Sequence, residues 1–85
     1  MHFHLPAIVT EANAMQLERD GLTNLAALKV IDCSDLKDFD STVLAVLLAW
    51  QKRLQADGMT LKVERPPEKL KVLANVYGVS GLLGI

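Results

Sequence analysis

The sequence predicts an α/β fold: a compact, single-layer, mostly parallel sheet of three to four strands with helices packed on it. Segments with apolar side chains at every second position alternate with segments whose apolar side chains recur every three or four positions. Strands that alternate with helices favour a parallel sheet with right-handed crossovers. With 85 residues, 51% of them hydrophobic, we expect one domain over residues 1–85.

The N-terminal part of the chain predicts a strand and then a helix. Residues 2–5 alternate between polar and apolar side chains, and Pro6 closes this first strand. Thr10 is the expected N-cap of the first helix, because its hydroxyl can accept a hydrogen bond from a free N–H group. Gly21 is the expected end of this helix, although the helical pattern can resume through Leu25.

The middle of the chain predicts a buried strand and the main helix. Residues 28–33 form the second strand, and a polar loop around Leu36 follows it. Asp40 and Ser41 begin the main helix, which Gly58 ends. The apolar side chains of its broad stripe are Val43, Leu44, Leu47, Leu48, Trp50 and Leu54.

The C-terminal part predicts a third strand and a closing helix. Residues 59–64 alternate in polarity, and Pro67 is placed to begin a helix at its first position. Gly78 ends this helix, and residues 79–85 form a short apolar tail. The expected apolar side of the closing helix comprises Leu70, Val72, Leu73, Val76 and Tyr77.

Charge and composition exclude several classes of protein. The formal net charge of −1 argues against a nucleic-acid-binding protein, and a single cysteine excludes a disulfide framework. Residues 1–50 carry seven acidic and three basic residues, whereas residues 51–85 carry six basic and three acidic residues. Residues 1–6 lack the pattern of a signal peptide, and the apolar run at 43–50 is shorter than the roughly 20 residues that span a bilayer. We therefore expect a cytosolic chain.

Catalytic and metal-binding patterns are not expected in this chain. No glycine-rich phosphate-binding loop occurs, and Cys33 is expected to be a buried structural thiol. His2 and His4 share one strand face, but no clear third ligand accompanies them, which favours an exposed pair over a metal site. We expect no catalytic residues, no cofactor and no metal.

A series of residues around the main helix resembles the STAS domain family, the fold of the anti-sigma-factor antagonists. In that family a strand ends in Asp, a short loop with one apolar residue follows, and Asp-Ser-Ser/Thr-Gly-Leu begins an apolar helix. The matching residues are Ile31, Asp32, Leu36, Asp40, Ser41, Thr42 and Leu44, followed downstream by residues 58–63 and 67–79. The resemblance covers nearly the whole chain from about Thr10.

Within that family the chain is most similar to the small cytosolic subunits of Mla-type phospholipid-transport ABC complexes. The minimal length, the start close to Leu5 and the closing residues 73–79 carry this similarity. It implies a non-catalytic subunit that docks on the ABC-type ATPase and supports it. Such a subunit is cytoplasmic and reaches the inner membrane only through its complex.

The resemblance implies that the start of the main helix contacts the partner. The expected partner-binding residues are Asp40, Ser41, Thr42, Val43, Ala45, Val46 and Ala49. Small side chains on this face allow another element to approach closely, but the last helix of the chain is an alternative cover for them. Asp40 and Ser41 are alternatively helix caps alone.

The alternative function is an anti-sigma-factor antagonist that an anti-sigma-factor kinase phosphorylates on Thr42 or Ser41. Val43 stands where the antagonists usually have Gly, and their usual Gly-Glu-Leu-Asp pattern after the first strand is missing. Both departures weigh against this alternative. The sequence leaves open whether the isolated chain forms a homodimer.

Overall fold

A small parallel sheet forms the centre of the fold. The computed structural model describes residues 2–85, and its main sheet contains β1 (Phe3–His4), β3 (Val30–Asp32) and β5 (Lys62–Glu64). The strand order is β1-β3-β5, and both neighbouring pairs are parallel. Ile31 of the central strand is fully buried. The predicted parallel α/β architecture is confirmed.

A second, two-stranded sheet was not predicted. It pairs β2 (Ile8–Val9) with β4 (Asp38–Phe39), again in parallel. Each strand has only two residues, which is too short for the two-residue alternation of polarity that identifies a strand in a sequence. The pairing holds the loop before the main helix against the segment after β1.

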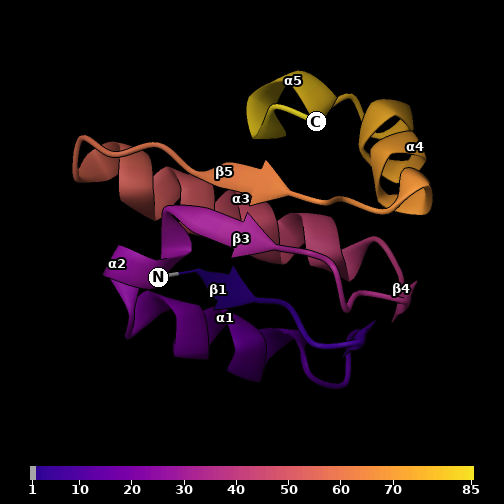
Figure 1. Cartoon of the computed structure of the whole chain (residues 1–85), viewed down its shortest axis with the longest axis horizontal. Helices are drawn as coiled ribbons and strands as arrows, with labels where there is room; N and C mark the ends of the chain where they lie inside the picture. The colour runs from indigo at the N-terminus through magenta and orange to yellow at the C-terminus, as the bar shows by residue number, and fades with distance from the viewer. Residues whose placement is uncertain (1) are drawn as a thin grey trace.

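The helices cover one face of the main sheet. The described residues form α1 (Ala14–Leu22), α2 (Leu25–Leu28), α3 (Thr42–Ala56), α4 (Glu68–Val76) and α5 (Ser80–Leu83). Figure 1 shows α3 passing behind the strands, between α1 and α5, and α3 contacts both of these helices. Among residues 2–85, no helix combines the length and the apolar character that crossing a membrane requires.

Trp50 joins three elements at the centre of the core. Its side chain is fully buried, and its ring lies edge-on to Phe3 of β1 with 5.0 Å between ring centroids. Its indole N–H donates a hydrogen bond to the Glu18 carbonyl oxygen of α1 at 3.0 Å. A Cβ on Gly21 would lie 2.4 Å from Trp50 Cε2. α1 ends at Leu22, one residue after the predicted end at Gly21, and the glycine lets this helix approach Trp50.

Several predicted boundaries also shift. The N-cap of α1 is Asn13 and not Thr10, whose carbonyl and hydroxyl oxygens accept hydrogen bonds within the preceding turn. Leu28 ends α2 and does not begin β3, while Pro67 precedes α4 as its N-cap. Local turns and tertiary contacts determine where these helices and strands begin and end. The apolar pattern in the sequence locates such ends only to within a few residues.

The predicted apolar side of α4 is only partly buried. Leu70 and Ala74, one turn apart, are its buried residues. Val72, Val76 and Tyr77 are exposed, contrary to the prediction. Because α4 contacts the body of the protein through a narrow stripe, its other apolar residues remain at the surface.

Replacing Gly21 by alanine tests the close approach of α1 to α3. We expect Gly21→Ala to lower the free energy of unfolding by about 1–3 kcal/mol, because the added methyl group overpacks against Trp50. Gly81→Ala is the matched control, since nothing lies within 4 Å of a Cβ at that position of α5. Urea denaturation followed by tryptophan fluorescence measures both variants. Equal stability of Gly21→Ala and wild type would contradict the packing described.

Candidate functional site

Asp40 organises the start of α3. Its Oδ1 atom accepts hydrogen bonds from the Thr42 backbone N–H at 2.9 Å and from the Thr42 hydroxyl at 2.5 Å. These bonds hold the pKa of Asp40 below its ordinary value, so its carboxylate is charged at neutral pH. The predicted capping role of Asp40 is confirmed. Ser41 occupies the N-cap position, but its side chain makes no capping hydrogen bond with the described residues.

The predicted partner-binding residues divide into two groups. Those with exposed or half-buried side chains lie at the start of α3 and along one side of it: Asp40, Ser41, Thr42, Ala45 and Ala49. Val43 and Val46 are buried in the core. Val43 is completely covered, whereas Val46, although almost fully buried, lines a hollow between α3 and α1.

An apolar hollow lies between α3 and the segment after α4. It has a volume of 260 Å³, and Ala45 and Leu48 of α3 face Tyr77 and Val79 across it. Ser41 and Leu44 complete its lining. The C-terminal helices therefore do not cover Ala45, and its methyl group remains exposed beside this hollow.

Two further hollows lie on the other side of α3, between it and α1. The first has a volume of 310 Å³ and the second of 320 Å³, and Glu18 lines both. Ala45 also lines the first, so it separates this hollow from the apolar one. We use the term α3 face for the surface formed by Ser41, Thr42, Ala45, Leu48 and Ala49 together with these three hollows.

The three hollows of the α3 face are small. Pockets that enclose small molecules typically have volumes of roughly 300–1,000 Å³, and each of these hollows lies at or below the lower end. Met15 and Tyr77 lie on opposite sides of Ala45 and are 69% and 59% exposed. Exposed Met and aromatic side chains are enriched at protein interfaces.

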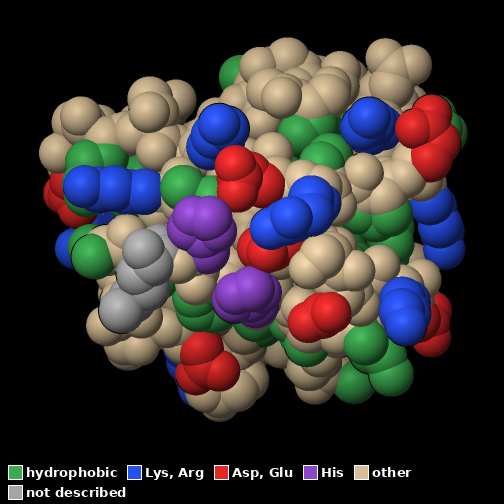
Figure 2. Space-filling view, in the orientation of Figure 1, with side chains coloured by type: hydrophobic (Ala, Val, Ile, Leu, Met, Phe, Trp, Pro, Cys, Tyr) green, Lys and Arg blue, Asp and Glu red, His purple; other side chains and the backbone are tan. Residues whose placement is uncertain are grey.

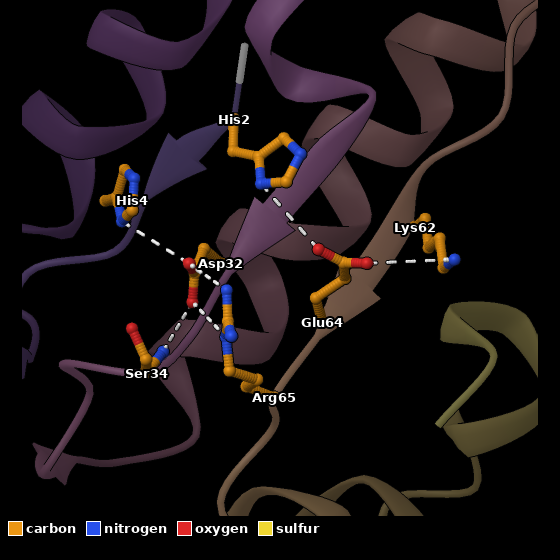
Figure 3. Close-up of polar contacts among 7 residues, drawn as sticks. All are labelled: His2, His4, Asp32, Ser34, Lys62, Glu64 and Arg65. Carbon is orange, nitrogen blue, oxygen red and sulfur yellow. Dashed lines mark hydrogen bonds and ion pairs between the residues drawn. The ribbon is translucent and has the colours of Figure 1, made fainter.

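A second cluster of polar residues lies on the sheet face that the helices leave open (Figure 2). Asp32 is its centre, with a side chain only 4% exposed. Its carboxylate accepts hydrogen bonds from the Ser34 backbone N–H at 2.9 Å and from Arg65 Nη2 at 3.2 Å. His4 Nδ1 lies 3.6 Å from it (Figure 3). The bonds from Ser34 and Arg65 hold the pKa of Asp32 well below its usual range.

Sequence reasoning missed this cluster because Asp32 and Arg65 are 33 positions apart. Only the structure shows this pairing, and with it the backbone of Arg65, which has a φ of 53° that non-glycine residues seldom adopt. In this conformation Arg65 Nη2 lies 3.2 Å from Asp32 Oδ2. The cluster therefore joins the ends of β3 and β5 and has a structural role.

The two histidines of this region lie beside different carboxylates. Glu64 lies 3.7 Å from both His2 and Lys62, so the two histidines pair with different carboxylates. In residues 2–85, no group of three or more His, Cys, Asp or Glu side chains is arranged to hold a metal ion. Burial raises the pKa of Cys33 to about 12, which keeps its thiol protonated.

A comparison with protein-family models matches nearly the whole chain. A family model described as "Mlab, STAS domain" matches residues 1–84. The matched region contains every helix and strand of the structure. Domains of this family are typically non-catalytic binding modules. No curated protein and no solved structure matches the chain significantly.

The Asp32 cluster predicts a specific loss of stability in acid. Because the pKa of Asp32 is lowered on folding, the free energy of unfolding falls as the pH drops below about 4, where the unfolded chain binds the proton first. Asp32→Asn removes this contribution, so its pH dependence is shallower. Arg65→Gln keeps the Ser34 bond and gives an intermediate dependence. Urea denaturation at a series of pH values measures the free energy of unfolding of wild type and both variants. If this free energy depended on pH in the same way in all three proteins, the prediction would be contradicted.

Proposed function

The chain belongs to the Mlab-type STAS domain family, and from this we propose that it is a non-catalytic subunit that docks on and supports the ATPase of an ABC-type phospholipid transporter. In this proposal the chain lies in the cytoplasm and is peripheral to the inner membrane through its complex. The family match implies the association with the ATPase. The observation on this chain that carries the proposal is the exposed α3 face.

The α3 face supports docking because it is shaped for close contact. Ala45 lies exposed between two hollows, so a partner can approach the α3 backbone without meeting a large side chain. Met15 and Tyr77 border these hollows and offer apolar surface on either side. Interfaces combine an apolar centre with a polar rim, and Asp40 and Lys52 are exposed charged residues beside this apolar surface.

The alternative, a switch phosphorylated by an anti-sigma-factor kinase, has less support. The Thr42 hydroxyl already donates to the Asp40 carboxylate, and a phosphate there would lie beside that negative charge. Ser41 has the freer hydroxyl, but it borders the apolar hollow. Mass spectrometry of the peptide 40–50 from protein purified from its native cells distinguishes the alternatives, because only the switch requires a phosphopeptide.

Charge placed on the α3 face tests the proposed function. We expect Ala45→Glu and Thr42→Glu each to weaken binding to the ABC-type ATPase at least tenfold, about 1.4 kcal/mol, because the longer side chain keeps the partner away from the α3 backbone and its carboxylate loses water in the interface. Isothermal titration calorimetry measures the affinity. Val46 is unsuitable for this test, since a charge in the core would unfold the protein.

Ala26→Glu is the matched control for this experiment. Ala26 is an exposed helical residue of α2 that lines none of the hollows of the α3 face. It receives the same change of charge and size, and its variant is expected to bind as tightly as wild type. If Ala45→Glu and Thr42→Glu also bound as tightly as wild type, the α3 face would not be the docking surface.

A further inference from the structure

The hollows between α1 and α3 carry acidic side chains that have no partner within residues 2–85. Glu11 lies exposed before α1, and Glu18 lies half-buried within it. Neither carboxylate takes part in an ion pair or a hydrogen bond in that region. Trp50 bonds to the backbone carbonyl of Glu18 and leaves the carboxylate available. Two negative charges therefore border this side of the α3 face without neutralisation.

The opposite charge lies at the far end of the same hollows. Lys52 is exposed, lines the second hollow and pairs with no carboxylate in the described chain. Arg53 beside it is already bound to Asp57, with 3.3 Å between Nε and Oδ2. Along the space between α1 and α3, the unpaired charges thus run from Glu11 through Glu18 to Lys52.

Small side chains of α3 line the two hollows between these charged residues. Ala45 lines the first hollow and Ala49 the second, and both belong to α3. A groove between two helices whose base is formed by small side chains can accept the side chains of a third helix. In such packing, the ridges of side chains on one helix fit into the grooves of its neighbours. The order of the charges gives that helix one favourable direction, because the reverse direction would oppose like charges.

We propose that the ATPase places a helix between α1 and α3, with basic side chains toward Glu11 and Glu18, an apolar side chain over Ala45 and an acidic side chain toward Lys52. This inference rests on the proposed function and specifies the chemistry of the partner at the same face. A second copy of the chain fits less well. Two copies would bring four unpaired carboxylates of this region together with only two unpaired lysines.

Charge reversal of the acidic residues tests the inference. The double variant Glu11→Lys/Glu18→Lys is expected to associate with the ATPase about tenfold more slowly at low salt, because it loses electrostatic steering. The difference is expected to shrink toward 1 M salt, where the Debye length is about 3 Å. Stopped-flow fluorescence measures the association rate, and circular dichroism confirms that each variant is folded.

Two further variants make the test specific. Asp20→Lys/Asp35→Lys is the matched control: it changes the net charge equally at exposed residues outside the hollows, and it is expected to bind like wild type. Lys52→Glu is expected to weaken binding although it makes the chain more acidic. A partner that is merely basic would bind Lys52→Glu more tightly, and that result would overturn the proposed charge order.

The outcomes separate this inference from the proposed function. If wild type binds the ATPase and the double variant binds equally fast, the inference is overturned and the proposed function stands. If wild type does not bind the ATPase, both are overturned. If sedimentation velocity shows that wild type forms a dimer and that the double variant does not, a second copy occupies this surface and the inference is again overturned.

Discussion

The contact between α1 and α3 at Trp50 determines how the rest of the molecule is arranged. Gly21 has no side chain, so α1 lies directly against the indole ring, and the indole N–H bonds to the backbone of Glu18. The same ring packs edge-on against Phe3 and so ties both helices to the sheet. Because α1 lies along one flank of α3 and α5 contacts the other, the strip containing Ala45 is left between them at the surface.

The two polar regions of the protein differ in how their charges are compensated. On the open face of the sheet, Asp32 is paired with Arg65, and Glu64 lies near His2 and Lys62 (Figure 3). A partner there would have to break or desolvate pairs that already stabilise the fold. On the α3 face, Glu11, Glu18 and Lys52 have no such pairs among the described residues. The electrostatics therefore favour docking at the helices rather than at the sheet.

The sequence predicts the elements with strong periodicity and misses the contacts between distant residues. The apolar stripe of α3 and the parallel order of the three main strands follow from local patterns. Gly21 was expected to end a helix because glycine often does so. The residue that requires a glycine here is Trp50, whose ring leaves no room for a Cβ, and it is 29 positions away. The same holds for the pairing of Asp32 with Arg65.

At the candidate site, the start of α3 was predictable from Asp40 and the residues after it. The sequence did not show which side chains of this helix reach the surface. Val43 and Val46 were expected to contact a partner, but α3 is buried over a broad arc that includes both. The resemblance marked this helix, and the packing of α1 and α5 decides which residues of it remain exposed.

Hydroxyl-radical footprinting of the chain alone and in complex with the ABC-type ATPase tests the central claim, that α3 and its flanks form the docking surface, most directly. Met15 and Tyr77 are reactive, exposed side chains on either flank of Ala45, and His4 is an exposed side chain on the open sheet face. The expected result is protection of Met15 and Tyr77 with unchanged oxidation of His4. Protection of His4 with unchanged oxidation of Met15 and Tyr77 would contradict the claim and place the partner on the sheet.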